Sequence, residues 1–221
     1  MLQEGQPASG SSGAAAQQGL SSLVYIVDDE PFVRSFLSRL LTSNGYQAVA
    51  FVSADELLGR DLASVPGCVL LDLFLPGLGG LEVQRVLQER APHLPIIFMS
   101  GRGTVPLSVE AMKNGAMDFF TKPLDTQKLL QAVSRALERS SAALVTRTQD
   151  AVFEERVRSL SPRQVEVIRL VAVGRLNKQI ATELEILEKT VKVHRARAMK
   201  KLGVKSVAEL VRLADRFSLS P

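Results

Sequence analysis

Between residues 23 and 139, short apolar runs alternate with segments whose apolar residues recur at helical spacing. The apolar runs lack a strict alternation of polar and apolar residues, so we expect strands that are buried on both faces. Strands of this kind form parallel sheets with helices on either side. The pattern therefore predicts an α/β domain with a doubly wound, five-stranded parallel sheet. The expected strands are LVYIV (23–27), YQAVAFV (46–52), CVLLDL (68–73), PIIFMS (95–100) and MDFFT (117–121).

Polar residues that can bind a cation and a phosphoryl group stand at the ends of the expected strands. Asp28 and Asp29 follow the first strand, and Asp72 lies near the end of the third. Ser100 ends the fourth strand, and Lys122 follows the fifth. Because the carboxyl ends of parallel strands meet at one edge of the sheet, these side chains should converge there. Each residue alone could be a helix cap or a surface ion pair, but the set favours a common site.

The chemistry of this set points to phosphoryl transfer. Crowded carboxylates favour a neutralising cation, and an oxygen-rich site with few protein ligands suits Mg²⁺. Lys122 can pair with Asp72 or with an anion on it, and Ser100 can donate a hydrogen bond to a phosphoryl oxygen. These groups suit the attack of a carboxylate on phosphorus, which gives an aspartyl phosphate.

Residues 22–139 resemble a two-component receiver domain. The resemblance implies that Asp72 is the phosphoacceptor and that Lys122 binds the phosphoryl group, with the peptide bond to Pro123 often cis. The motifs that carry it are VDDE (27–30), LLDLFLPGLGG (70–80), MSGRG (99–103), AMKNGAMDFF (111–120) and TKP (121–123). The Mg²⁺ ligands that it implies are Asp28, Asp29, Asp72 and the backbone carbonyl of Phe74.

The same resemblance implies a switch. Ser100 stands at the position of the switch hydroxyl, and Phe119 at the position of the switch aromatic. A dianion on Asp72 would draw Ser100 towards it, and Phe119 would turn into the vacated space. The surface formed by residues 104–121 would then change shape. In related receivers this surface dimerises.

The charge is unevenly distributed along the chain. Residues 1–155 hold 12 Lys and Arg against 17 Asp and Glu, whereas residues 156–221 hold 15 against 6. A basic second part is a candidate for contact with nucleic acid, although a solvated basic surface would give the same balance. Ser161 and Pro162 form a helix start signal, and no strand pattern follows them. Helices are expected at about 162–173, 177–184, 188–202 and 206–216.

One face of the expected helix 188–202 mixes lysines with small apolar residues, which suits a major groove better than a solvated surface. Residues 160–214 resemble the LuxR-type helix-turn-helix domain, with 188–202 as the recognition helix and 206–216 in the dimer contact. Base contacts are expected from Lys192, Val193 and Ala196, on the face that also carries Lys189 and Lys200. Phosphate contacts are expected from Lys178, Thr190, Arg195, Arg197, Lys200 and Lys201.

Two residues depart from the LuxR-type pattern. Glu185 stands where the turn usually has Gly, and a side chain there costs on the order of 1 kcal/mol if φ is positive. Leu187 stands where Ser or Asn usually caps the recognition helix, which costs about 1 kcal/mol. We expect a less stable turn and reduced DNA affinity, but an intact fold.

The remaining segments carry less information. Residues 1–22 are dominated by Gly, Ser, Ala and Gln and should form a disordered tail. The domain boundaries that we expect are 23–139 for the receiver, 140–158 for a linker that can be helical, and 159–221 for the helix-turn-helix domain. Cys68 should be a small buried side chain, and His93 should be exposed. No run is long enough for a membrane helix and no signal peptide is evident, so a cytoplasmic protein is expected.

Together the two parts resemble a response regulator of the FixJ/NarL class, a transcription regulator rather than an enzyme. Its expected partners are a sensor histidine kinase, double-stranded promoter DNA, a second copy of the chain after phosphorylation, and RNA polymerase. Three alternatives remain open from the residues alone. They are a regulator that works without phosphorylation, an interaction protein with a vestigial basic domain, and a phosphatase with an Asp nucleophile.

Overall fold

The computed structural model describes residues 22–62, 65–102 and 105–217. The chain divides into two compact units, and the boundary between Leu144 and Val145 falls inside a long helix, α5 (Thr126–Arg158). The segment 140–158, where we expected a linker, lies within this helix. The tail expected over 1–22 lies outside the described residues, apart from Ser22.

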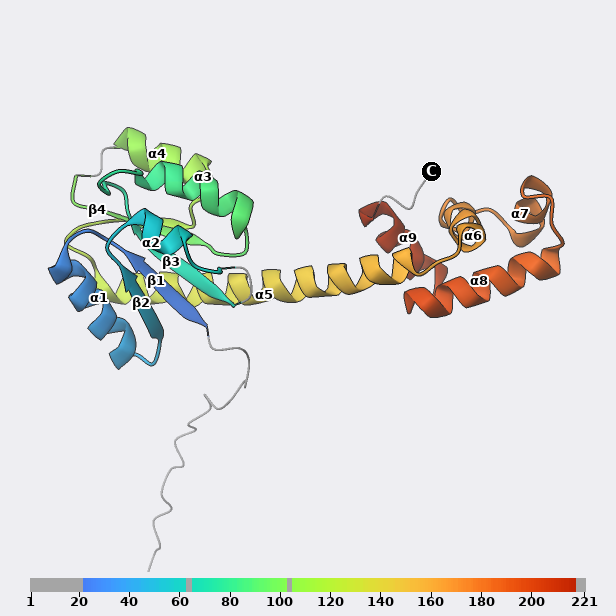
Figure 1. Cartoon of the computed structure of the whole chain (residues 1–221), viewed down its shortest axis with the longest axis horizontal. Coiled ribbons are helices and arrows are strands. Elements are labelled where there is room, and N and C mark those ends of the chain that lie inside the picture. Colours follow the sequence, from blue (N-terminus) through green and yellow to red (C-terminus); the bar gives the residue numbers. More distant parts are fainter. Residues whose placement is uncertain (1–21, 63–64, 103–104, 218–221) are drawn as a thin grey trace, which may run out of the picture. The chain divides into compact units, whose positions relative to one another are not determined.

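The first unit contains a parallel sheet of five strands in the order β2-β1-β3-β4-β5 (Figure 1). This confirms the predicted fold class. Strand β2 is added on one side of β1, and β3, β4 and β5 are added on the other side, so the strand order switches between β1 and β3. Ligands of open α/β sheets bind at such a switch point. The strands are β1 (Leu23–Val27), β2 (Gln47–Phe51), β3 (Gly67–Asp72), β4 (Ile96–Ser100) and β5 (Asp118–Thr121).

Helices cover both faces of the sheet (Figure 1). The N-terminal part of α5 packs with α1 on one face, where Leu37 and Leu129 are fully buried among residues of β1, β3 and β4. The other three helices cover the opposite face, where Leu57, Val83 and Ala111 are buried. The helices of this unit before α5 are α1 (Pro31–Ser43), α2 (Ala54–Leu58), α3 (Gly80–Arg90) and α4 (Val105–Lys113).

Local sequence signals fix several helix starts. The Ser53 side chain accepts a hydrogen bond from the Glu56 amide at the start of α2. The Asp125 carboxylate accepts hydrogen bonds from the amides of Gln127 and Lys128 at the start of α5. Gly80 lets α3 approach the end of β3, because a Cβ there would lie 2.7 Å from the Asp72 carbonyl oxygen. The loop after Asp72 is therefore held tightly against the sheet.

One side chain differs from the expectation. His93, in the segment between α3 and β4, is 4% exposed and not open to solvent. Phe32, which lies on α1 among apolar residues at helical spacing, is 78% exposed, whereas Leu37 and Leu41 are buried. The buried face of α1 therefore contains fewer residues than the set of apolar residues at helical spacing. Cys68 is fully buried, as predicted.

The second unit is helical in its described residues. Its core includes Phe153 from the end of α5, together with Val167, Ile180 and Val191 from the helices that follow. Ser161 accepts a hydrogen bond from the Gln164 amide, and Gln164 accepts one from the Ser161 amide. This reciprocal cap begins the next helix where the sequence predicted it. The helices are α6 (Pro162–Ala172), α7 (Asn177–Glu183), α8 (Glu188–Leu202) and α9 (Val207–Arg216).

Within the described ranges, none of the helices combines the length and the apolar character that crossing a bilayer requires.

Candidate functional site

Three aspartates meet at the carboxyl edge of the sheet. Asp28 follows β1, Asp29 comes next, and Asp72 ends β3. One carboxylate oxygen from each of the three lies within 4.8 Å of the others. Asp28 is fully buried and Asp72 is 5% exposed, whereas Asp29 is open to solvent. The convergence that the strand ends predicted is therefore present, and the donor set is made of hard oxygen ligands that suit a divalent cation.

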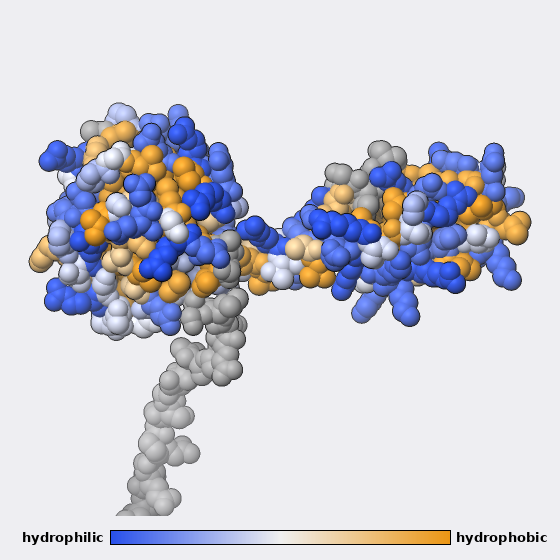
Figure 2. All heavy atoms as spheres, viewed as in Figure 1, coloured by the Kyte–Doolittle hydropathy of each residue, from blue (hydrophilic) through white to orange (hydrophobic). Residues whose placement is uncertain are grey.

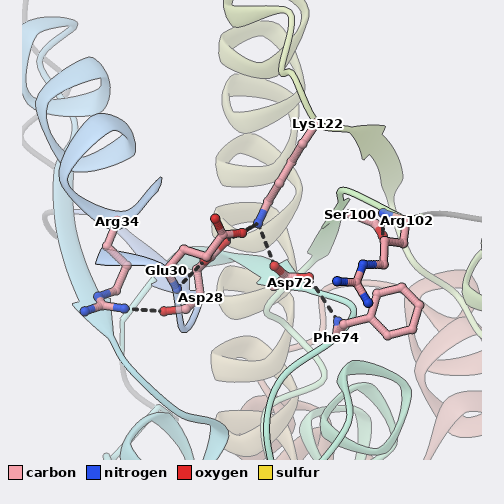
Figure 3. A network of polar contacts seen from close by, with 8 residues as sticks. All are labelled: Asp28, Glu30, Arg34, Asp72, Phe74, Ser100, Arg102 and Lys122. Atoms are coloured by element: carbon pink, nitrogen blue, oxygen red, sulfur yellow. Dashed lines mark hydrogen bonds and ion pairs between the residues drawn. The ribbon is translucent and has the colours of Figure 1, made fainter. Parts of the chain in front are cut away.

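Lys122 reaches into this cluster from the segment after β5 (Figure 3). Its Nζ lies 2.8 Å from Oδ2 of Asp28 and 2.6 Å from Oδ2 of Asp72. It also lies 3.0 Å from Oε1 of Glu30, whose side chain is 60% exposed. One ammonium group therefore contacts the carboxylates of Asp28, Glu30 and Asp72. Lys122 and these three side chains carry a net negative charge when all three carboxylates are ionised.

The buried position of the cluster changes its ionisation. Burial raises the pKa of Asp28, and the hydrogen bonds from Lys122 and from the Glu30 amide offset only part of this effect. Burial acts to lower the pKa of Lys122, but its bonds to Asp28, Asp72 and Glu30 outweigh burial and raise the pKa above its ordinary value. Lys122 therefore stays charged, and further positive charge would favour the ionised form of Asp28.

Backbone contacts fix the orientation of both buried carboxylates. The Glu30 amide donates to Oδ1 of Asp28 at 2.9 Å, and Arg34 donates to the Asp28 carbonyl at 2.7 Å. The Phe74 amide donates to Oδ1 of Asp72 at 2.9 Å. Both oxygens of Asp72 are thus held, one by an amide and one by Lys122. A cleft over this carboxylate is lined by Asp29, Glu30, Asp72, Phe74, Gly101, Arg102 and Lys122.

Ser100 ends β4, next to Gly101 in the lining of this cleft, and Phe119 lies on the neighbouring strand β5. Ser100 is fully buried, and its Oγ accepts a hydrogen bond from the Arg102 amide at 3.2 Å. Its carbonyl accepts one from the Lys122 amide at 2.8 Å. The Phe119 ring is partly buried, with its centroid 6.3 Å from that of Phe98. The bond between Lys122 and Pro123 is cis, in agreement with the expectation.

The residues expected to contact DNA lie on α8, except for Lys178 on α7. Val193 is 41% exposed, and Thr190 and Arg195 are half-buried. Figure 2 shows mostly hydrophilic side chains along the edge of the second unit where α8 runs in Figure 1. The structure therefore presents one polar surface with a small apolar centre. Its other exposed members are Lys189, Lys192, Ala196, Arg197 and Lys200.

Two of these side chains have partners within the unit. Lys192 forms an ion pair with Glu188, one helical turn earlier, at 2.9 Å. Arg195 donates to Oδ1 of Asn177 at 2.9 Å and so ties α8 to the first turn of α7. DNA would compete with Glu188 for Lys192 and with Asn177 for Arg195.

The turn between α7 and α8 has the backbone conformation for which Glu185 and Leu187 are unfavourable residue types. Glu185 adopts φ +54°, the left-handed region that favours glycine. Leu187 is the N-cap residue of α8 and has no side-chain oxygen to offer the first amides. Its side chain is 76% exposed. At the first position the usual Gly would adopt positive φ without strain, and at the second the usual Ser or Asn would cap α8.

Sequence reasoning missed Glu30 and Arg34, which contact Lys122 and Asp28. Glu30 belongs to the VDDE motif, so its acidity was visible, but its contact with Lys122 spans 92 positions. Arg34 lies one turn into α1, where only the folded loop brings it to the Asp28 carbonyl. Local patterns carry no signal for either contact.

Comparisons with known proteins agree with this geometry. Residues 24–134 match the response regulator receiver domain, and residues 158–214 match the bacterial regulatory proteins of the luxR family. Nodulation protein W of Bradyrhizobium diazoefficiens is 40% identical over 208 residues, which cover 94% of this chain and 92% of that protein. Response regulator protein TodT of Pseudomonas putida is 42% identical over 197 residues, which cover 89% of this chain and 87% of that protein.

A solved structure supports the same assignment. The response regulator StyR is 38% identical, with a TM-score of 0.77, and the match covers 89% of this chain and 99% of that one. The chain belongs to the response regulators that join a receiver domain to a LuxR-type DNA-binding domain. This family consists of transcription regulators rather than enzymes with a separate substrate.

Proposed function

We propose that this chain regulates transcription through a phosphoryl group that Asp72 accepts from a sensor histidine kinase. The observation that carries the proposal is the position of Asp72 at the floor of a cleft, with Lys122 Nζ 2.6 Å from Oδ2. An oxygen of Asp72 attacks phosphorus as the bond from phosphorus to the kinase histidine breaks, and that histidine then takes a proton from solvent. Lys122 moves its hydrogen bond from Asp72 to a phosphoryl oxygen.

Asp28, Asp29 and Asp72 would hold Mg²⁺, and the receiver resemblance adds the backbone carbonyl of Phe74. The fit rests on the three carboxylate oxygens, which lie within 4.8 Å of one another and are the hard oxygen ligands that Mg²⁺ prefers. When bound, Mg²⁺ supplies positive charge next to the phosphoryl oxygens. Asp28 and Asp29 orient that charge, while Asp72 remains the nucleophile.

The response to phosphorylation involves Ser100 and Phe119. In the proposal, Ser100 Oγ exchanges its bond from the Arg102 amide for a bond to the phosphoryl group, and Phe119 turns inward. The exposed stripe of Val105, Val109 and Met112 on α4 supports dimerisation through this side of the receiver. These residues recur at the spacing of one helical face, and a second copy of the chain would bury them.

The dimer would bring two copies of α8 to a two-fold related promoter site. Lys192, Val193 and Ala196 would contact base edges, and basic residues around them would contact phosphates. Binding of the second half-site then occurs at high effective concentration, so dimerisation raises affinity. The phosphate contacts that we propose are Lys178, Lys189, Thr190, Arg195, Arg197 and Lys200. Because the proposed target is promoter DNA, we place the protein in the cytoplasm, with RNA polymerase as a further partner.

A phosphatase with an Asp nucleophile is not favoured by the site. Such enzymes usually need a second acid two residues after the nucleophile, and Phe74 stands there. Its side chain is 49% exposed at the rim of the cleft and has no proton to donate.

The decisive experiment treats the full chain with Mg²⁺ and acetyl phosphate and measures intact mass, dimerisation and selection of DNA from a random pool. We expect the wild type to gain one phosphoryl group, to dimerise and to enrich a two-fold related sequence. Asp72→Asn should show none of these changes. Asp55→Asn, an exposed aspartate on α2, is the control and should behave as the wild type. Acid-labile labelling of Asp72→Asn would refute the acceptor assignment.

A further inference from the structure

The last turns of α5 contact the C-terminal end of α8 within the second unit. Arg156 donates from Nη1 to the Leu202 carbonyl at 3.1 Å. In the other direction, Lys201 donates from Nζ to the Ser159 carbonyl at 2.7 Å. The last carbonyls of a helix lack partners within the helix, and the helix dipole makes that end favourable for cations. Arg156 therefore donates a hydrogen bond to a carbonyl of the last turn of α8 that has no partner within the helix.

Two further contacts fix the same part of α5 to α9 and the residue after it. The rings of Phe153 and Phe217 lie with their centroids 4.7 Å apart, and Phe153 is 6% exposed. Asp150 forms an ion pair with Arg216 at 2.5 Å. Phe153, Asp150 and Arg156 all precede residues 158–214, which match the luxR family. The end of α5 is thus an integral part of the second unit, although it lies outside the family match.

The N-terminal end of α8 is held less well than its C-terminal end. Leu187 offers no cap to the first amides, and Glu185 in the preceding turn has positive φ. Along α8, which the structure describes throughout, the buried residues are Val191, Ala198 and Leu202. Val191 and Ala198 are small side chains, and the partly buried Met199 also packs against this core. Arg195 ties the middle of α8 to α7, and the contacts with Arg156 and Ser159 hold its last turn. The orientation of α8 therefore depends on polar contacts as well as on core packing.

We propose that Arg156 is a positioning residue for DNA binding. From α5, it holds the last turn of α8 so that the exposed surface around Val193 keeps one orientation. The proposal rests on the proposed function of α8 as the recognition helix. Arg156 itself is not expected to touch DNA, since it bonds to the end of α8 that is farthest from Leu187 and the first turn.

Gly203 provides an independent way to displace Arg156. It follows α8 with φ +75°, and a Cβ built there would overlap the Arg156 guanidinium. The guanidinium is the far end of a flexible side chain, so it would move aside and lose its bond to Leu202. Gly174 has φ +83°, but among the described residues, apart from its two chain neighbours, none has a heavy atom within 4 Å of a Cβ built there. Gly203→Ala and Gly174→Ala therefore share the backbone cost, and only Gly203→Ala displaces Arg156.

The first test compares Arg156→Met with Arg156→Lys in the phosphorylated full chain, on the DNA duplex that the wild type selects. Met keeps the aliphatic stem without a donor, whereas Lys keeps a cationic donor. We expect Arg156→Met to weaken specific binding about tenfold, the loss of one hydrogen bond to a charged group, and Arg156→Lys to restore most of it. The slope of log affinity against log salt should not change. A slope reduced by about 1 would make Arg156 a phosphate contact and overturn the proposal.

Stability alone must also be separated from positioning. If Arg156→Met lowers the unfolding midpoint but binds the duplex as tightly as the wild type well below that midpoint, the role is merely structural and the proposal is wrong. The glycine pair gives the second test. Gly203→Ala should weaken binding more than Gly174→Ala, and this difference should vanish when Arg156→Met is already present. Equal effects of the two glycine substitutions in the wild-type background would also overturn the proposal.

Amide hydrogen exchange separates this proposal from the proposed function. The amides of Gly203 and Val204 bond to carbonyls of the last turn of α8. They should exchange faster in Arg156→Met than in the wild type, whether or not a DNA sequence is found. Failure of the wild type to select any DNA would refute the proposed function. Unchanged exchange in Arg156→Met would refute the proposal that Arg156 holds the last turn of α8.

Discussion

The ammonium group of Lys122 occupies the Asp72 oxygen that would otherwise be free, with Nζ 2.6 Å from Oδ2. The other oxygen, Oδ1, accepts the Phe74 amide. In the proposed transfer, Lys122 would move its hydrogen bond from Asp72 to a phosphoryl oxygen. Because Nζ also bonds to Asp28 and Glu30, it can give up one partner without leaving the site. The same contacts would keep Lys122 within reach of phosphoryl oxygens in the proposed transfer.

Removal of the Lys122 charge should destabilise the receiver unit. In Lys122→Met, Asp28 and Asp72 lose their shared cation while they stay buried, and an unpaired buried charge costs about 3 kcal/mol. Calorimetry of the full chain should show a lower midpoint for the receiver transition. Added Mg²⁺ should raise this midpoint more in Lys122→Met than in the wild type, because the variant has no competing ammonium group. An unchanged midpoint without Mg²⁺ would contradict the prediction.

Glu30→Gln is the matched control for that experiment. It removes the third and most exposed partner of Lys122, and exposed ion pairs contribute less than about 1 kcal/mol. We expect a receiver midpoint close to that of the wild type. If Glu30→Gln lowered the midpoint as much as Lys122→Met, the stabilising effect of Lys122 would come from its exposed partner Glu30 and not from Asp28 and Asp72.

The fold and most of the site could be predicted because their signals are local. Apolar runs that end in Asp28, Asp72 and Ser100 give both the strands and the edge at which they meet. The strand bounds differ from the prediction by a residue at most at each end. Ser161 and Pro162 fixed a helix start in the same way, because a cap bonds to amides two or three residues away.

The parts that could not be predicted are long-range contacts. Arg156 and Leu202 are 46 positions apart, and nothing near Arg156 in the sequence marks it as a partner of α8. The burial of His93 and the exposure of Phe32 have the same origin. Helical spacing shows which residues share a side of a helix, but only the packed neighbours decide how much of that side is covered.

Cys68 should resist alkylation while the receiver is folded. Burial raises the pKa of its thiol to about 12, so at pH 9 only about a thousandth of the folded molecules carry the thiolate that reacts. Iodoacetamide should modify the urea-unfolded chain readily and the native chain only through opening. Because the folded pKa lies above that of a free thiol, this group stabilises the fold below about pH 9, and the contribution is lost towards pH 12. Native labelling as fast as unfolded labelling would contradict the buried position.

The turn before α8 can be stabilised by restoring the residue types that its geometry favours. Glu185→Gly removes the cost of a side chain at φ +54° and should stabilise the second unit by about 1 kcal/mol. Leu187→Ser adds an N-cap and should add about 1 kcal/mol, because the leucine side chain is already exposed. Calorimetry of the full chain measures both effects as a higher midpoint of the second transition.

Glu183→Gly is the control for the turn. It makes the same substitution at the last residue of α7, where the backbone is helical, and should destabilise by up to about 1 kcal/mol. Opposite signs for Glu185→Gly and Glu183→Gly would tie the effect to the backbone conformation. If both glycine variants lower the midpoint, Glu185 is not strained in solution.

Lys192 should contribute to sequence discrimination. It stands on the exposed surface of α8 beside Val193, and its present partner Glu188 is an exposed ion pair that DNA can replace at little cost. We expect Lys192→Ala to weaken specific binding by about 1–3 kcal/mol more than non-specific binding, measured on the selected duplex and on a scrambled one. Lys205→Ala, an exposed lysine beyond α8, should leave this ratio unchanged. Equal losses on both duplexes would make Lys192 a phosphate contact, because phosphates carry no sequence information.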